Sequence, residues 1–352
     1  MSWPLGLAER GLLPNRLIRA GIRRLLAKRL ESEAERHHEP EGALAGFLNS
    51  MAQAPIALVP ALANSQHYEV PAAFYQAVLG TQLKYSSAYW PEGVQVLDQA
   101  EEAMLRLTAD RARLADGQRV LELGCGWGSL SLWMARRFPA STIVAVSNSS
   151  SQRAFIERRA AEQGLSNLTV VTADMNAFAA PGPAFDRVVS VEMFEHMRNW
   201  SALLQRVRGW LRDDGFFFAH VFSHRRYAYT FESAADDDWM GRHFFSGGMM
   251  PSADLFARVA APFAVVVRHE VDGTHYARTA EAWLANLDAH AGQIESLFRR
   301  DLGATAARIQ LERWRIFFLA CAELFAFNGG NEWLVTHHLL APTGLAPAKG
   351  RP

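Results

Sequence analysis

Between residues 119 and 224 the sequence alternates short apolar runs with longer amphipathic stretches. The apolar runs predict strands, because they are short, rich in valine and phenylalanine, and bounded by turn residues. We expect strands at 119–124, 141–148, 168–174, 185–194, 215–222, 263–271 and 333–341, and helices at 128–138, 150–164 and 200–215. Strands that alternate with helices form βαβ units, so this pattern predicts an α/β fold with a doubly wound, mostly parallel sheet.

The turn after the first predicted strand is rich in glycine. The stretch VLELGCGWGSL carries Gly124, Gly126 and Gly128, which permit a tight turn and a close approach of a ligand to the backbone. A dinucleotide site requires the spacing GxGxxG and a carboxylate at the end of the next strand. Here the third glycine comes one residue early, and the next strand ends in VSNSSSQ. Glu122 lies two residues before the glycines instead, and this combination favours S-adenosylmethionine over a dinucleotide.

The composition excludes some classes of partner. The 36 basic residues balance the 36 acidic residues, so no net positive field attracts nucleic acid. The two cysteines, Cys125 and Cys321, have neither disulfide nor metal-ligand spacing, which predicts a reducing, cytoplasmic compartment and no metal site. We expect no signal peptide, because the first residues lack a basic segment followed by an apolar one. No apolar run is long enough to span a membrane.

A basic segment at residues 15–35 has the apolar spacing of an amphipathic helix, with Asn15 as its expected N-cap. Ile18 and Ile22 begin the apolar stripe, and arginines occupy much of the remaining surface. Such a helix either docks on the protein through its apolar stripe or lies on an anionic membrane. We favour docking, with peripheral membrane contact as the alternative, and we expect a linker at 37–42.

Several longer motifs resemble one family. They are HYEVPAAFYQAVLGTQLKYSSAYW, VEMFEHM, DDDWMGRHFFSGGMMPS, HYARTAEAWLANLD and AELFAFNGGNEWL, and with the glycine turn they span roughly residues 64–340. They resemble the S-adenosylmethionine-dependent methyltransferases grouped with the cyclopropane fatty acid synthases, and within that group the coclaurine-type N-methyltransferases. The resemblance implies a seven-stranded, Rossmann-like class I methyltransferase domain at 64–340, with helical insertions that form a substrate lid. It leaves an N-terminal helical region at 1–63 and a disordered tail at 341–352, and a homodimer is one option for the assembly.

The resemblance also implies contacts to the cofactor. Tyr85 and Ser86 would close over its amino acid end, while Asn148 and Gln152 would take the place of the ribose contact. An amide is both a donor and an acceptor, which would compensate for the missing carboxylate. The residues expected at the cofactor are Tyr85, Ser86, Glu122, Gly124, Gly126, Gly128, Asn148, Gln152, Asp174 and Met175. Asp174 would accept from the adenine amino group, with Met175 against the ring face.

The expected catalytic centre is VEMFEHM, at the end of the fourth predicted strand. Glu192, Glu195 and His196 lie within five residues there, where a ligand crevice is expected. An amine is protonated at neutral pH and unreactive until it loses a proton, and a histidine beside carboxylates suits that task. The carboxylates would hold the ammonium form of the substrate. We therefore expect His196 as the base and the two glutamates as the ammonium site.

A lipid acceptor is the alternative. By resemblance to the cyclopropane synthases, Glu195, His220 and Tyr276 could cage a bicarbonate used in lipid biosynthesis. It would remove a proton from the carbocation that forms when the double bond of a phospholipid chain accepts the methyl group. The basic segment 15–35 would then bring the protein to the bilayer. This sequence has Ser87 where a cysteine is usual, which puts one wall of such a site in doubt.

The C-terminal motifs favour the amine. By resemblance, His275 and Glu323 stand where N-methyltransferases place substrate-binding residues. His220 and Tyr276 are also expected to bind the substrate. A carboxylate among aromatic residues is costly unless it is paired, and a cationic substrate would pair Glu323. Most of the neighbouring aromatic residues are expected in the core: Phe317, Phe318, Phe325, Phe327 and Trp333. A third hypothesis, a regulator that binds the cofactor without catalysis, is disfavoured by the intact glutamate–histidine cluster.

Overall fold

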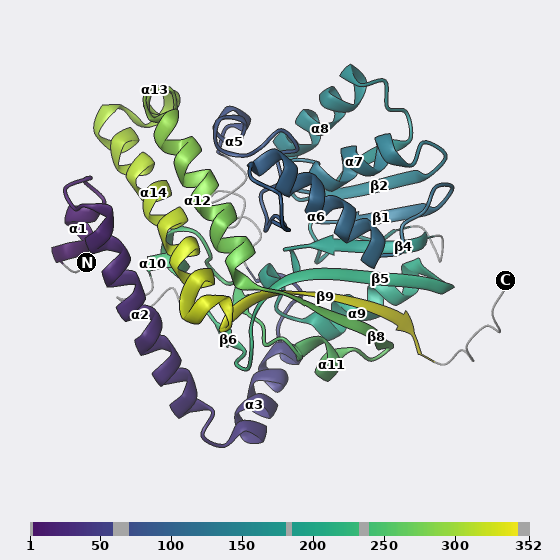
Figure 1. Ribbon diagram of the computed structural model, residues 1–352. Coiled ribbons are helices and arrows are strands. Elements are labelled where there is room, and N and C mark those ends of the chain that lie inside the picture. The colour runs from purple at the N-terminus through teal and green to yellow at the C-terminus, as the bar shows by residue number, and fades with distance from the viewer. Residues whose placement is uncertain (1–2, 59–69, 181–184, 232–238, 344–352) are drawn as a thin grey trace.

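The structure is a computed structural model that describes residues 3–58, 70–180, 185–231 and 239–343 (Figure 1). Its centre is a seven-stranded sheet in the order β3-β2-β1-β4-β5-β9-β8. The strands are β1 (Arg119–Leu123), β2 (Thr142–Ser147), β3 (Leu168–Thr172), β4 (Phe185–Val191), β5 (Leu211–His224), β8 (Phe263–Val271) and β9 (Trp333–Pro342). The strands β1 to β5 pair in parallel, and β9 runs antiparallel to both β5 and β8. The predicted doubly wound, mostly parallel sheet is confirmed.

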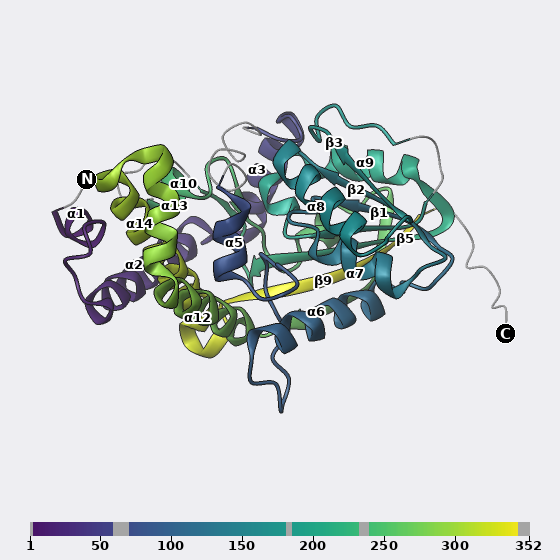
Figure 2. The same cartoon turned by 90° about the horizontal axis from the view of Figure 1, so that it is seen from above.

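Helices cover both faces of this sheet. On one face lie α6 (Leu97–Arg111), α7 (Ser129–Arg137) and α8 (Ser150–Glu162), and on the other lie α9 (Trp200–Trp210) and α11 (Leu255–Val259) (Figures 1 and 2). Alternate residues of each strand point to opposite faces, so Val189 and Phe218 pack toward α6 and α7 while Val188 and Phe217 pack toward α9. The helix expected at 200–215 ends at Trp210, because the chain already pairs with β4 from Leu211 onward.

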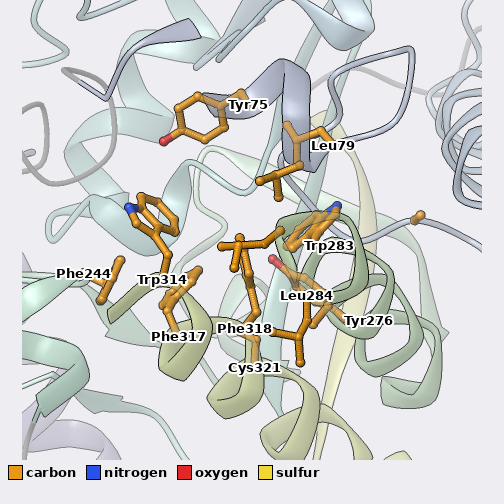
Figure 3. Packing of buried hydrophobic residues seen from close by; sticks show 14 of the residues in the cluster. Tyr75, Leu79, Phe244, Tyr276, Trp283, Leu284, Trp314, Phe317, Phe318 and Cys321 are labelled. Atoms are coloured by element: carbon orange, nitrogen blue, oxygen red, sulfur yellow. The ribbon is translucent and has the colours of Figure 1, made fainter. Parts of the chain in front are cut away.

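A second helical layer lies beyond the end of the sheet. It contains α5 (Ala72–Val78), α12 (Gly273–Ala289), α13 (Ala291–Leu302) and α14 (Ala304–Ala326) (Figure 1). Figure 3 shows the aromatic packing between these helices, with Trp283 and Tyr276 from α12 facing Trp314 and Phe318 from α14. The aromatic residues that the sequence predicted as core are buried, with the half-buried Phe327 at the margin.

The first helices of the chain are α1 (Trp3–Ala8), α2 (Asn15–Arg36) and α3 (Pro40–Gln53), and α3 contacts α9 (Figure 1). Helix α2 packs along α14, and its apolar stripe contacts the core through Ile18, Ile22, Leu26 and Leu30. The favoured interpretation of this segment, docking through the apolar stripe, is therefore what the structure shows. The expected cap is wrong by one residue, since Pro14 holds the N-cap position and Asn15 is already helical. Among the described residues, no helix is both long and apolar enough to cross a membrane.

Short elements complete the fold around the carboxyl ends of the strands. They are η2 (Phe194–His196), β6 (Tyr229–Thr230), α10 (Trp239–His243), β7 (Met249–Met250) and η3 (Phe327–Gly330). The predicted boundary between 63 and 64 lies outside the described residues, as do residues 344–352 of the predicted tail. Residues 341 and 342, which were also expected in the tail, belong to β9.

Candidate functional site

Two adjoining cavities open at the carboxyl ends of β1, β2 and β4. The first encloses about 740 Å³ and the second about 620 Å³, counting space that is open to solvent. Four residues line both: Gly124, Gly126, Gln152 and Glu192. The first also receives Asn148, Asp174, Met175 and His196, and the second receives Tyr85, Ser86 and Glu122. Eleven of the residues that the sequence proposed therefore meet around one divided cavity. Most lie at or after the carboxyl ends of parallel strands, which share one edge of the sheet, while Tyr85 and Ser86 come from the loop between α5 and α6.

The glycine turn forms the wall between the two cavities. Gly124, Gly126 and Gly128 have φ values of 77°, 51° and 82°, in the left-handed region that favours glycine. A Cβ on Gly124 would lie 2.6 Å from the side chain of Met193, and one on Gly128 would lie 2.7 Å from Ile156. A Cβ on Gly126 would meet no described atom within 4 Å. Gly126 thus faces open space, whereas Gly128 lines neither cavity and is required for packing against α8.

Several buried polar groups on the cavity walls lack a partner within the described chain. Ser147 donates to the side-chain oxygen of Gln152 at 2.7 Å, which leaves the amide nitrogen of Gln152 without an acceptor. In the second cavity, the hydroxyls of Thr108 and Ser129 and the indole nitrogen of Trp127 also have no hydrogen-bond partner among the described residues. Buried polar groups are normally paired. Four such groups around one cavity indicate a polar ligand with several hydrogen-bonding groups.

Glu122 lies at the base of the second cavity. Burial raises the pKa of its carboxyl group to about 8, although the hydroxyl of Ser131 donates to it. The group is therefore mostly protonated at neutral pH. A nearby cation would favour its ionised form, because an opposite charge lowers the pKa of a carboxyl group.

Glu192 is held where β4 ends. Its backbone adopts φ of 47°, a conformation that costs a non-glycine residue of order 1–3 kcal/mol. The side chain is 8% exposed. One carboxylate oxygen accepts from the backbone N–H of Ser87 at 2.9 Å and lies 3.1 Å from Nε2 of His220, and the other accepts from the hydroxyl of Tyr276 at 2.7 Å. Burial raises the pKa of Glu192 above its ordinary value, although the charge of Lys84 and the hydrogen bonds from Ser87 and Tyr276 act against this rise.

Glu195 and His196 point in different directions. Glu195 is fully buried, and one of its oxygens accepts from the backbone N–H of Phe222 at 2.7 Å. Burial and the neighbouring charge of Glu192 raise the pKa of Glu195 well above its ordinary value, and Glu195 lines neither cavity. The half-buried His196 lines the first cavity, and its ring stacks on Phe245 at 4.4 Å between centroids.

The segment 244–252, part of the expected lid, contacts the site directly. Phe245 covers the ring of His196, and Ser246 lines the first cavity. Ser246 also donates to the carbonyl of Gly241 at 2.6 Å, which ties the segment to α10. The part of this motif at 236–238 lies outside the described residues.

The proposed bicarbonate cage is not formed as predicted. His220 and Tyr276 do converge, but on the carboxylate of Glu192 rather than on a space beside Glu195. The left-handed backbone at Glu192 turns its side chain into this position, while Glu195 turns toward β5. A carboxylate of the protein thus stands where the alternative hypothesis required a bound bicarbonate.

Two expected substrate contacts also differ. Glu323 has two cationic partners within the chain, Arg19 at 2.9 Å and Arg23 at 2.8 Å, both from α2. The argument that a cationic substrate must pair this carboxylate is therefore wrong. His275 accepts from the backbone N–H of Trp90 at 3.0 Å and packs against Tyr89, and it lines neither of the two cavities.

Lys84, in the motif LKYSSAYW, belongs to the site although no pattern in the sequence singled it out. This buried residue lines the second cavity and donates to the hydroxyl of Ser86 at 2.5 Å and to the carbonyl of Ser87 at 2.7 Å. Burial lowers the pKa of Lys84 to about 8. Its position next to the expected Tyr85 and Ser86 was the available signal. The ammonium group fixes the backbone that donates to Glu192.

Comparison with known proteins gives a consistent answer. The model of the mycolic acid cyclopropane synthetase family matches residues 60–332. The (S)-coclaurine N-methyltransferase of Thalictrum flavum subsp. glaucum is 37% identical over 94% of this chain and 93% of its own, and that of Papaver somniferum is 34% identical over 94% and 95%. A crystal structure of coclaurine N-methyltransferase bound to N-methylheliamine and S-adenosylhomocysteine superposes with a TM-score of 0.92 at 36% identity, and covers 96% of this chain and 98% of that one. The chain therefore belongs to the mycolic acid cyclopropane synthetase family and is an S-adenosylmethionine-dependent methyltransferase.

Proposed function

We propose that the protein transfers a methyl group from S-adenosylmethionine to the nitrogen of a small amine. The observation that carries this proposal is the position of Glu192 and His196 on one cavity wall, next to the glycine turn. The extensive similarity to coclaurine N-methyltransferases supports it. The lipid alternative loses its support, because the carboxylate of Glu192 fills the place of the bicarbonate that it required.

The unpaired groups of the cavities fit the cofactor. Gln152 would bind the ribose diol through its free amide N–H groups, with Asn148 beside it, while Asp174 and Met175 would contact the adenine. The second cavity, with Tyr85, Ser86 and the uncompensated hydroxyl of Ser129, would hold the amino acid end. When bound, the cofactor supplies an electrophilic methyl group on a sulfonium.

The chain's own residues prepare the amine. A substrate enters largely as an ammonium ion, and the nearly buried carboxylate of Glu192 favours its binding by charge. His196 would then accept the proton that the nitrogen must lose before it attacks. The rings of Phe245 and Phe222, which pack on each other near His196, would exclude water from the reacting nitrogen.

Substitution of Gly126 by alanine tests the cofactor site. The added methyl group points into open space, so we expect the fold to tolerate it at a cost of about 1–2 kcal/mol for the left-handed backbone. We expect the Kd for S-adenosylhomocysteine, measured by calorimetry, to rise at least tenfold. Gly128→Ala is the matched control, because its methyl group would collide with Ile156 and lower the melting temperature instead. An unchanged Kd in Gly126→Ala would exclude this turn as a cofactor contact.

The proposed function is tested by a turnover screen of the purified protein. Release of S-adenosylhomocysteine is measured with a panel of alkylamines and tetrahydroisoquinolines and, in parallel, with vesicles of unsaturated phospholipid. We expect turnover with amines, and products heavier by one methylene unit at nitrogen. Turnover with phospholipid alone, with methylated or cyclopropanated chains, would overturn the proposal.

Further parts of the proposal concern the surroundings of the enzyme. The catalytic domain comprises residues 64–340 in this proposal. The candidate assembly is a homodimer, and light scattering can test it by measuring the mass of the particle in solution. A cytoplasmic location agrees with the burial of both free cysteines.

We also propose that α2 can contact anionic membranes. The proposal rests on the exposed Arg16 and Arg24 and on Leu17 and Leu25, which are 54% and 52% exposed. Failure to sediment with anionic vesicles would exclude it.

A further inference from the structure

A chain of three buried or half-buried side chains leads from the end of α6 to Glu192. Arg111, the last residue of α6, places a guanidinium nitrogen 3.0 Å from Nδ1 of His337. Nε2 of His337 lies 3.0 Å from Nδ1 of His220. Nε2 of His220 lies 3.1 Å from the carboxylate of Glu192. Both histidines are completely buried.

The sheet aligns these residues. His220 and His337 are directly opposite each other in the ladder between β5 and β9, and Val191 of β4 pairs with His220. Because these strands are neighbours in the sheet, the two rings lie in one row on the face covered by α6. Glu192, the residue after the end of β4, reaches this row through its left-handed backbone. His338, the next residue along β9, points to the opposite face and packs on Phe256 of α11.

The direction of the hydrogen bonds follows from the arginine. A guanidinium group only donates, so Nδ1 of His337 must accept and its proton must reside on Nε2. That proton is donated to Nδ1 of His220, whose own proton then resides on Nε2 and is donated to Glu192. Burial, with the charges of Arg111 and Lys84, lowers the pKa of each histidine well below its ordinary value, so both rings are neutral.

Because the hydroxyl of Tyr276 donates to the other oxygen of Glu192, two proton arrangements satisfy this row. In the first, Glu192 is ionised and accepts from His220. In the second, Glu192 carries one additional proton and donates it to Nε2 of His220, and both rings hold their protons on Nδ1. The second state would aim the Nδ1–H of His337 at the guanidinium of Arg111, which has no acceptor. The first state is therefore the one that Arg111 permits.

We infer that Arg111, acting through His337 and His220, is a positioning residue that keeps Glu192 ionised and ready for a cationic substrate. The inference deepens the proposed amine function and rests on it for its kinetic consequences. The other titratable groups facing Glu192 are Lys84 from the preceding loop, Glu195 from η2, Tyr276 from α12 and Cys321 from α14. His269 of β8 faces Arg111, and His338 lies beside His337. None of these groups accepts a hydrogen bond from His337 among the contacts of the described residues.

The first test reads the tautomers directly and needs no substrate. In the full-length protein with 15N-labelled histidine, the ring nitrogen shifts of His220 and His337 are measured between pH 6 and 8. We expect both rings to be neutral with the proton on Nε2. A proton on Nδ1 of either ring, or a doubly protonated ring at pH 7, would overturn the inference whatever the substrate is. Arg111→Met should shift both rings toward the Nδ1–H form.

The second test measures the acid limb of the pH profile of kcat/KM. Arg111→Met permits the protonated state of Glu192, so we expect the limb to move up by about one pH unit, with KM more affected than kcat. Arg111→Lys also presents only donors and should keep most of the wild-type profile. Arg113→Met, which removes a nearby arginine stacked on Phe216, is the matched control. The same shift of the acid limb should appear with two amines of different pKa. An acid limb of kcat/KM that stays at the wild-type pH in Arg111→Met would overturn the inference, even if N-methylation itself is confirmed.

Discussion

Replacing His196 by alanine is expected to lower kcat for amine methylation by at least 100-fold while S-adenosylhomocysteine still binds. The imidazole lines the first cavity together with Glu192, so it is within reach of a substrate bound there. General base catalysis by a positioned side chain contributes on the order of 10²–10⁴-fold, which sets the expected loss. The measurement is steady-state turnover with the best amine of the screen, beside calorimetric binding of S-adenosylhomocysteine.

A matched control separates chemistry from packing. His275 is also half-buried and also packs against an aromatic ring, that of Tyr89, but it lies outside both cavities. His275→Ala should therefore lose stability to a similar extent and keep most of its turnover. Wild-type turnover in His196→Ala would show that the substrate nitrogen loses its proton elsewhere. Equal losses in the two variants would show that the effect is one of folding.

Much of this site could be predicted from the sequence because of a general property of parallel sheets. The residues after β1, β2, β3 and β4 are far apart in the chain, yet the carboxyl ends of these strands lie at one edge. The motifs around Gly126, Gln152, Asp174 and His196 therefore meet without any knowledge of individual side chains. The order of strands and the helices between them follow from periodicity in the same way.

The remaining features depend on conformation at single residues. Glu192, and not Glu195, contacts His220 and Tyr276 because its backbone adopts a positive φ, which no periodicity reveals. The pairing of Glu323 with α2 joins residues about 300 positions apart through long, flexible arginine side chains. Such contacts depend on how the helices dock, since local sequence does not determine the partner of a surface arginine. The contact between Arg111 and His337 could not be predicted either, because it also depends on how α6 docks on the sheet.

Replacing Glu192 by glycine should lower kcat/KM for the amine by at least 100-fold without loss of the fold. Glycine adopts the left-handed backbone of this position without strain, so the variant removes the carboxylate and relieves the local conformational cost. The ammonium substrate then loses its charged partner, and hydrogen-bonded charges of this kind are worth on the order of 1.5–3 kcal/mol each. A variant that remains folded at the assay temperature and still binds S-adenosylhomocysteine would confirm that the loss is functional.

The donors that surround Glu192 allow a sharper form of this test. The backbone N–H of Ser87, the ring of His220 and the hydroxyl of Tyr276 remain in place in Glu192→Gly. A small carboxylate such as formate, or bicarbonate, fits the space and the donors that the glutamate leaves. We therefore expect either anion to restore part of the activity in a saturable manner, with chloride at equal ionic strength as the control. Glu192→Gln, whose amide still fills the space, should show no rescue. Wild-type activity in Glu192→Gly would exclude the carboxylate as the ammonium site. If neither anion restores activity, these three donors do not form an independent anion site.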